Sequence, residues 1–432
     1  MVRKLTIKGS ILGISVSLFA LCGSVLAQNY DNPGLGQQPV ISHPQDYKPL
    51  GVRAGAFMLH PGVQLGAQWT DNAFYANTDL KSDTIFHIRP YITAQSTWSR
   101  HSLNVRVAAD FARYAKYSER DYEDYFLGIS GRVDVKARSA FTYSLDYMNL
   151  HEGLNNRNSE QGIQPTRYDF YGGTVGYYHS FSRLNLSATF GMNWLDFDNV
   201  VGEDGDVIDN QDRDRKSTNL TLRVGYQAWI DKELFISYTG YTVDYAEEFD
   251  RNGYARSGDG YTINTGINLL MTERLQGDFF FSYYNRNFDD PRLPSNSGWR
   301  WILAGSAGVQ WNPTDLTSVY GRISSSVQDT TDANATSFTN TLLSLRATHE
   351  LLRNVQLNAF VSYAINDYEP IDPTLENTRT KDNVIRAGFG ASWFINRYMY
   401  LNASYNYTTL DSSLPNDDFT TNTVWLLLGL EY

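Results

Sequence analysis

In several stretches every second residue is apolar, and charged residues recur among the positions in between. Most of them are arginines, whose guanidinium groups make forked hydrogen bonds with carboxylates, phosphates and hydroxyl oxygens. Placed around a water-filled passage, these side chains could guide anionic or hydroxyl-rich solutes. The candidates for lining such a passage are Arg89, Arg106, Asp110, Arg132, Asp134, Asp146, Arg223, Asp278, Arg300, Arg322, Arg346 and Arg386.

A second interpretation of the same residues stays open. Charges of both signs on the inner wall of a barrel can pair across neighbouring strands, which satisfies them without any ligand. Tyr114, Tyr171 and Tyr284 could likewise offer stacking surfaces to sugars.

The segment 196–215 is the most acidic part of the chain. It holds eight acidic residues against Arg213 and Arg215. Clustered carboxylates bind calcium, but the spacing of a calcium loop with its central glycine is absent. The segment is predicted to be a solvated loop, and calcium binding by it stays open.

Enzymatic motifs are missing. The seven histidines show no metal-ligand spacing, and no G-x-S-x-G elbow is present. The one cysteine, Cys22, lies in a segment that we expect to be removed, which leaves no thiol for catalysis, metal binding or disulfides. We therefore expect no catalytic, cofactor or metal site, and no enzyme.

The elements that would position these side chains are strands. From Phe57 to Trp69 the odd positions are apolar, while the even positions are mostly polar or glycine. Successive side chains of a strand face opposite sides of the sheet, so one face suits lipid and the other water. The alternation recurs within 103–111, 184–194, 261–269, 301–311, 355–363 and 385–393.

The connections between these segments form two classes. Eight short turns alternate with nine longer connections, and seventeen connections join eighteen strands. This arrangement is typical of outer-membrane barrels, whose short turns lie in the periplasm. The fold class is therefore all-β, a transmembrane antiparallel up-and-down β-barrel of about 18 strands that spans residues 56–432.

The N-terminal part has a different character. A basic start is followed by an apolar stretch and by Val25 and Ala27, which predicts a signal peptide over residues 1–27. Its removal leaves 33 basic and 47 acidic residues, a net charge of −14, which argues against a nucleic-acid partner. Residues 28–55, rich in proline and glycine, are predicted to form a flexible periplasmic arm, with entry into the lumen as a plug left open.

Aromatic residues gather where the strands meet the turns. Trp98, Phe181, Trp229, Trp311 and Phe394 are predicted to form the interfacial girdle on the short-turn side, in contact with membrane lipids. The last strand ends on Tyr432 and resembles the signal that the barrel-assembly machinery reads.

The first strand carries a more specific motif. The run from Phe57 to Gly66, FMLHPGVQLG, is followed by DNAFY from Asp71 to Tyr75. This opening resembles that of the putative β-barrel porin 2 family, and the resemblance extends by pattern to Tyr432. It implies an outer-membrane barrel associated with export of exopolysaccharide or capsule, either as the conduit or as the partner of a periplasmic polysaccharide export protein. The family has no established catalytic residues, and Asp71 and Asn72 are expected to cap the first external turn.

Three functions are consistent with the sequence. The first is a channel in the outer membrane of a Gram-negative bacterium, as conduit or partner for export of an extracellular polysaccharide. The second is a general diffusion porin for small solutes. The third is a closed barrel whose external loops bind a partner. Planar-bilayer conductance and the effect of gene deletion on surface polysaccharide separate the three.

Overall fold

The computed structural model describes residues 44–155, 162–202, 204–330, 332, 334–372, 374 and 378–432. The side chains of residue 45 and of residues 296–305 are outside this description. The predicted signal peptide and residues 28–43 of the predicted arm also lie outside the described residues, so both predictions stay open.

Eighteen long strands make up the barrel in the described part of the chain. Their outward positions carry mainly β-branched, aromatic and leucine side chains, which favour the extended conformation. The strands are β2 (Phe57–Thr70), β3 (Asp83–Ser96), β4 (Ser102–Tyr114), β5 (Tyr122–Lys136), β6 (Ser139–His151), β7 (Arg167–Ser180), β8 (Leu184–Phe197), β11 (Arg215–Trp229), β12 (Lys232–Tyr245), β13 (Gly258–Thr272), β14 (Leu275–Arg286), β15 (Asn296–Thr314), β16 (Thr317–Asp329), β17 (Ala335–Leu352), β18 (Val355–Pro370), β19 (Lys381–Asn396), β20 (Met399–Ser412) and β21 (Phe419–Glu431).

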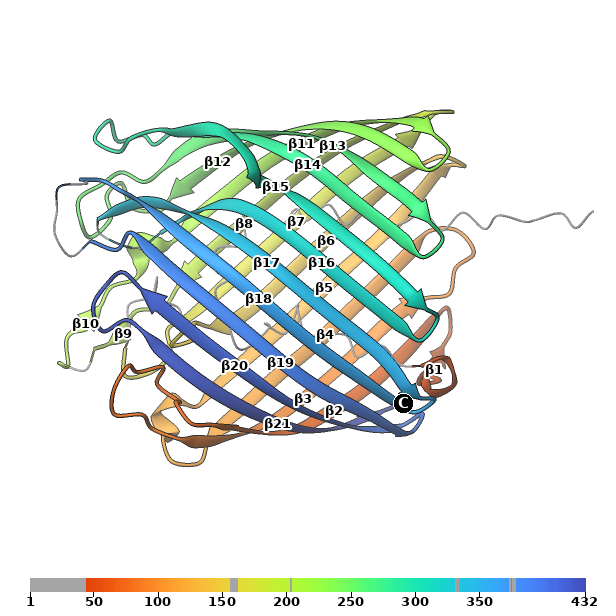
Figure 1. The fold of residues 1–432 in the computed structure, drawn as a ribbon, viewed down its shortest axis with the longest axis horizontal. Coiled ribbons are helices and arrows are strands. Elements are labelled where there is room, and N and C mark those ends of the chain that lie inside the picture. Colours follow the sequence, from red (N-terminus) through yellow and green to blue (C-terminus); the bar gives the residue numbers. More distant parts are fainter. Residues whose placement is uncertain are drawn as a thin grey trace, which may run out of the picture.

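The sheet closes on itself. Each of these strands pairs antiparallel with the next along the chain, and β2 pairs with β21 from Gly62 opposite Glu431 to Thr70 opposite Thr423. Closure pairs the two end strands, which an open sheet would leave as edges. Between β15 and β16 the pairing runs from Ser306 opposite Ser324 to Thr314 opposite Thr317. The prediction of an antiparallel up-and-down barrel of about 18 strands is confirmed (Figure 1).

The two ends of the barrel differ. One end, called the turn end here, carries the eight short turns, the chain terminus Tyr432 and the short strand β1 (Val52–Ala54). The other, the loop end, carries nine connections. These are loop 1 (71–82), loop 2 (115–121), loop 3 (152–166), loop 4 (198–214), loop 5 (246–257), loop 6 (287–295), loop 7 (330–334), loop 8 (371–380) and loop 9 (413–418).

The loops contain only short regular elements in the described residues. Loop 2 includes the 3-10 helix η3 (Ser118–Arg120), and loop 4 includes η4 (Gln211–Arg213) with the small hairpin of β9 (Val200–Val201) and β10 (Val207–Ile208). None of the helices in the described chain is long and apolar enough to cross a membrane.

The alternation of faces is visible in each strand. In β11 the outward side chains of Leu220, Leu222 and Val224 are 44%, 47% and 41% exposed, because the barrel exterior is open to its surroundings. The positions between them, Thr221 and Arg223, make contacts with inward residues of neighbouring strands. The period of two seen in the sequence therefore separates a lipid face from a luminal face.

Four of the five residues predicted for the turn-end aromatic girdle lie on the outside of the barrel, and their contact with lipids stays a prediction. Trp98, Phe181, Trp229 and Trp311 are about half exposed on the outside. Phe394 is fully buried, in contact with Tyr400 and Tyr47, so its assignment to the girdle is wrong. It occupies an even position of β19, the face on which the inward residues of that strand lie.

The described part of the predicted arm lies against the turn end of the barrel. It forms the 3-10 helix η2 (Gln45–Tyr47) and then β1, which pairs with β2. Tyr47 packs against the inward side chain of Phe394 with ring centroids 6.1 Å apart, and the Arg397 guanidinium donates to the Asp46 carbonyl at 3.0 Å. Tyr47 therefore sits just inside the mouth of the lumen.

A charge introduced on the two faces of β11 is expected to change the free energy of unfolding by different amounts. Leu222→Lys places an ammonium on the lipid face halfway along the strand and is expected to lower the free energy of unfolding by about 2–4 kcal/mol. Thr221→Lys, one residue away on the luminal face, is the matched control and is expected to change it by less than about 1 kcal/mol. Denaturant titration in lipid vesicles measures both, and equal losses would contradict the assignment of the faces.

Candidate functional site

Seven strands present a mainly neutral and polar surface to the middle of the lumen. Halfway along strands β6–β8 and β11–β14, inward positions carry mostly serine, threonine, asparagine or glycine. Their hydroxyl and amide groups bond across neighbouring strands, and examples are Ser144 with Thr174 at 2.8 Å, Thr221 with Thr239 at 2.9 Å and Ser282 with Asn264 at 2.5 Å. Such groups both donate and accept hydrogen bonds, so the wall offers many weak sites to water or to a polyhydroxylated solute.

Most of the charged residues predicted to line the lumen are paired. The ion pairs are Arg89 with Asp110 at 2.8 Å, Arg132 with Asp134 at 2.6 Å, Arg322 with Asp278 at 3.1 Å, and Arg223 with Glu233 at 3.0 Å. Sequence reasoning missed Glu233, because it lies beside a turn. These contacts favour the interpretation in which luminal charges satisfy one another.

The other five candidates are Arg106, Asp146, Arg300, Arg346 and Arg386. Arg106 lies over the Tyr91 ring at 5.6 Å, and Arg346 is exposed on the inward face of β17, opposite Tyr320 and Phe360. Asp146 is opposite Gly128 and Gly172. Arg386 is opposite Ser362 and Thr408. The backbone of Arg300 pairs with Ser282, and its side chain is outside the described part of the structure. That all twelve line a pore stays a prediction.

Of the three tyrosines considered as sugar platforms, one is on the wrong face. Tyr171 is 44% exposed and contacts Tyr147 on the outside of the barrel, with ring centroids 5.1 Å apart. Its neighbour Phe170 is the inward residue, since it belongs to a buried cluster inside the wall. Tyr114 and Tyr284 do lie on the luminal side, near the loop end.

Two histidines that seemed scattered in the sequence meet in one luminal network. His87 Nδ1 lies 2.9 Å from Asp110, and His151 Nδ1 lies 2.8 Å from Asp124. Between them the Tyr122 ring stacks on His151 at 3.6 Å and meets His87 edge-on at 6.3 Å. The signal that could have revealed His87 is its spacing of two from Arg89, which places both on one face.

Burial is highest at the loop end of the lumen. On β3 the inward residues Asp83, His87 and Arg89 are 1%, 1% and 8% exposed, whereas Thr93 and Gln95, nearer the turn end, are partly or largely exposed. Residues at the loop end of the opposite wall are also buried, since Tyr284 and Arg286 of β14 are 6% and 3% exposed. The loop end is therefore packed from all sides.

Arginine side chains join the long loops to one another through ion pairs and hydrogen bonds, and each such contact is called a clasp here. Arg213 of loop 4 makes two hydrogen bonds with Glu152 of loop 3, at 2.9 and 2.5 Å, while its guanidinium lies 4.1 Å above the Phe197 ring. Arg251 of loop 5 holds Asp212 of loop 4 at 2.8 Å. Each clasp joins two consecutive loops.

Further clasps continue around the rim. Arg256 of loop 5 pairs with Asp250 at 2.6 Å and donates to the carbonyl of Thr330 in loop 7 at 3.2 Å. Arg379 of loop 8 pairs with Asp417 of loop 9. Arg120 of loop 2 donates to the Gly162 carbonyl of loop 3 at 2.9 Å. The loop end is thus a ring of interlocked loops.

The first external turn is capped as expected. Asp71 accepts hydrogen bonds from the backbone and side chain of Asn422, at 2.7 and 2.6 Å. Asn72 is fully buried and bonds to the carbonyls of Ala76 and Thr420. Their interactions stabilise loop 1 against the last strand.

Four carboxylates of the acidic segment 196–215 have partners in loop 5, in β8 or in loop 4 itself. Asp212 binds Arg251, Asp214 accepts from the Phe197 amide at 2.7 Å, and Asp204 and Asp209 accept from backbone amides two residues on. No group of three or more His, Cys, Asp or Glu with the geometry of a metal site occurs among the described residues.

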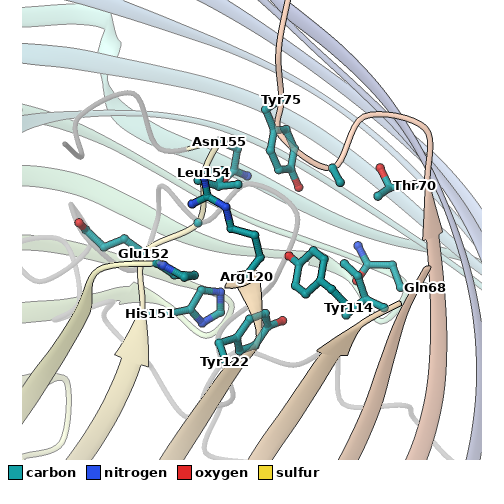
Figure 2. A pocket seen from close by; sticks show the side chains of 14 residues that line it. Gln68, Thr70, Tyr75, Tyr114, Arg120, Tyr122, His151, Glu152, Leu154 and Asn155 are labelled. Atoms are coloured by element: carbon teal, nitrogen blue, oxygen red, sulfur yellow. The ribbon is translucent and has the colours of Figure 1, made fainter. Parts of the chain in front are cut away.

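A cavity lies beneath loops 1 to 3. Its open and enclosed space together is about 620 Å³. Tyr75, Arg120, Tyr122 and His151 are gathered around it, with Gln68 and Thr70 on one side (Figure 2). Aromatic rings beside hydrogen-bonding groups make this a polar, ring-lined space at the outer end of the lumen.

The comparisons with known proteins fit this architecture. The family model named Putative beta-barrel porin 2 matches residues 43–432. The chain belongs to this family. This porin-family protein is an outer-membrane β-barrel channel, and porins are a class that normally has no enzymatic activity. Its turn end then faces the periplasm and its loop end the exterior.

Several solved structures are similar to this porin at low sequence identity. They include OpdO of Pseudomonas aeruginosa, with 9% identity, a TM-score of 0.46, and 90% of this chain and 99% of that chain covered. OccAB3 of Acinetobacter baumannii has 11% identity and a TM-score of 0.45, over 88% and 100% of the two chains. The siderophore receptor PirA of Pseudomonas aeruginosa has 7% identity and a TM-score of 0.42, over 87% and 80%. No curated protein matches the porin in sequence.

The clasp between loops 3 and 4 should control access to the loop end. Arg213→Ala removes the guanidinium that forms two hydrogen bonds with the Glu152 carboxylate, which is 4% exposed, and breaking such a buried pair costs about 3–5 kcal/mol. We expect faster proteinase K cleavage in loop 4 on intact cells and a larger single-channel conductance. Arg213→Met with Glu152→Leu should stay closed, because it leaves no buried charge. Arg113→Ala, which breaks an exposed pair with Glu123, is the control, and a cleavage rate as high as in Arg213→Ala would refute the clasp.

Asp214 predicts a pH dependence of loop 4. Burial, together with the nearby Asp196 carboxylate, raises the pKa of Asp214 to about 6, above its ordinary 3.8. Above pH 6 Asp214 is ionised in the folded protein, which lowers the free energy of unfolding. Protonation restores this free energy as the pH falls from about 6 towards 3.8. Asp214→Asn should be more stable relative to the wild type at pH 7 than at pH 5 in denaturant titrations. An equal difference at both pH values would contradict the prediction.

Proposed function

We propose that this outer-membrane channel serves the export of an extracellular polysaccharide, as conduit or partner. The observation that supports this most is the neutral wall of hydroxyl, amide and glycine positions halfway along the lumen, illustrated by Ser144, Thr174, Thr221 and Thr239. A sugar polymer can exchange its hydrogen bonds with such a wall as it moves, without meeting a charged site that binds it tightly. Eighteen strands enclose a lumen wider than side chains alone can fill.

The pairing of luminal charges supports the same function. Arg322 with Asp278 and Arg223 with Glu233 neutralise each other on the wall. A neutral interior neither repels nor retains a long chain that carries many identical units, whereas each unpaired charge would act once per unit. The proposal includes no catalytic activity.

A closed barrel with partner-binding loops is the second candidate. The interlocked loops, held by Arg213, Arg251 and Arg256, favour it, because they pack the loop end. In the export proposal the same loops must open when polymer passes. General diffusion of small solutes has less support, since a packed loop end obstructs the lumen.

Two partners belong to the proposal. The turn end would receive polymer from a periplasmic polysaccharide export protein. The last strand β21, with outward Val424 and Leu426 and the exposed terminal Tyr432, would be read by the barrel-assembly machinery during insertion.

Deletion of the gene tests the export role. We expect loss of extracellular polysaccharide from the cell surface, its retention inside the envelope, and full recovery with the wild-type gene. Immunoblots of surface and periplasmic polysaccharide measure both pools. Unchanged surface polysaccharide with high conductance in planar bilayers would instead indicate a diffusion porin, and unchanged polysaccharide with no conductance a closed, partner-binding barrel.

A further inference from the structure

The barrel wall is interrupted between β15 and β16 towards the loop end. Pairing of the two strands ends at Ser306 opposite Ser324, although β16 continues to Asp329. In the described backbone, residues 325–329 of β16 pair with β17 but not with β15, and β17 stays paired with β18. The pairing of β15 with β14 shifts register at the same level. The loop-end halves of β16 and β17 are therefore attached to the wall only on the β18 side.

The outer face of β17 changes character where this interruption begins. Leu345 and Leu343 are 48% and 53% exposed, as expected for a lipid-facing surface. The next residues on the same face, Thr341, Thr339 and Ser337, are only 9%, 5% and 0% exposed. Their side chains are hydroxyls, which suit a covered position better than contact with lipid. This part of the outer face is therefore covered by other parts of the protein.

The inner face of β14 lies against the covered face. Asp329 is opposite Ser337 and so belongs to the outer face of β16. Its carboxylate nevertheless lies 3.7 Å from the guanidinium of Arg286, which shares the inner face of β14 with the luminal Asp278. Asp329 also lines a cavity together with Tyr245 of β12. The loop-end halves of β16 (325–329) and β17 (335–341), called the flap here, therefore lie inside the wall as a second layer.

Arg256 of loop 5 holds the tip of the flap. Its guanidinium donates to the carbonyls of Thr330 and Ala335 at 3.2 Å and to that of Asp332 at 3.3 Å. Asp250 of the same loop balances its charge at 2.6 Å. Arg256 is 6% exposed, so water competes little for these hydrogen bonds. One buried side chain thus fixes three backbone carbonyls at and beside loop 7.

Other groups oppose the inside position of the flap. Within the described part of the structure, Nε and Nη1 of Arg286 have no hydrogen-bond acceptor, and the buried Thr339 hydroxyl and Gln328 Oε1 have no partner. Residues 325–329 also lack a neighbouring strand on the β15 side. Unmet buried groups cost free energy, whereas the bonds of Arg256 favour the inside position. Opposing contributions of this kind allow an element to adopt two positions.

We infer that the flap is the gate of this channel, which narrows the loop end while Arg256 holds it inside and widens it when released. Barrel diameter grows with the number of strands around the circumference, and the inside position withdraws two strands from it. On release, residues 325–329 can continue the pairing with β15 that begins at Ser306 opposite Ser324. The inference goes beyond the proposed function, because such a gate acts on any solute that crosses the lumen.

Cysteine labelling in lipid vesicles tests the position of the flap. A maleimide dissolved in the lipid should react with Leu343→Cys but not with Thr339→Cys, four residues away on the same face. Adding Arg256→Met should raise the rate at which a water-soluble maleimide reacts with Thr339→Cys about tenfold or more, because hydrogen bonds to three carbonyls are lost. Adding Arg213→Ala, which loosens loops 3 and 4 without touching the flap, is the control and should leave that rate unchanged.

Single-channel recording tests whether the flap is a gate. Arg256→Met should stay open about tenfold longer than the wild type. In that variant, Arg286→Cys with Asp329→Cys, joined by a short bis-methanethiosulfonate linker, should suppress conductance until a reductant removes the linker. Heat-modifiable migration in electrophoresis checks folding. Arg256→Lys, which keeps the charge but not the planar fork of donors, carries the test if Arg256→Met does not fold.

The outcomes separate the gate from the export role. Reaction of Thr339→Cys with the lipid-dissolved maleimide would place it on the lipid face and overturn the flap. An equal rise in labelling with Arg213→Ala would overturn the role of Arg256, and conductance that is unchanged by Arg256→Met or by the linker would overturn the gate. Unchanged surface polysaccharide after gene deletion would refute export and leave these outcomes as they are.

Discussion

Backbone pairing between the first and last long strands is the constraint on which the rest of the structure depends. In lipid no water is available for an open edge, so β2 and β21 must satisfy each other's amides and carbonyls over the length from Gly62 to Thr70. Once the sheet is closed, the alternation of side chains has only one arrangement, with apolar groups outside and polar groups inside. Every luminal contact described above follows from that arrangement.

Burial inside the loop end raises the free-energy cost of leaving a charged side chain unpaired. On the outer rim Arg113 and Glu123 are partly solvated and their pair contributes little. Inside the loop end Arg213 and Glu152 are almost fully buried, where an unpaired partner would be costly. Arginine suits this position because its five donors reach a carboxylate, a neighbouring carbonyl and an aromatic face at once. The loops are therefore joined by the residue type that tolerates burial best when paired.

The fold was predictable because its signal is local. The period of two in 57–69 and the regular spacing of turns gave the strand number, the faces and the two ends, and eleven of the twelve luminal candidates occupy described side chains on inward strand positions. Contacts between distant strands carried no such signal. The meeting of His87 with His151, and of Arg213 with Glu152, depends on how loops fold over the opening, which alternation does not encode. Phe394 is a different case, because the alternation in β19 already places its even position inward and only its nearness to a turn suggested the girdle. Its contact with Tyr47 was not foreseeable, since Tyr47 lies in a segment without periodicity.

Charge is distributed unevenly along the lumen. Midway along β11 and β12, neutral groups such as Thr221 and Thr239 face the interior. At the loop end, four arginines and three carboxylates line the space between loops 4, 5 and 7. Arg213, Arg251 and Arg256 each bond to another loop, so a ligand that competed for one of them would weaken a contact between loops. Binding and opening would then be the same event, because a ligand can shift a closed barrel towards an open one only by interacting more strongly with the open form.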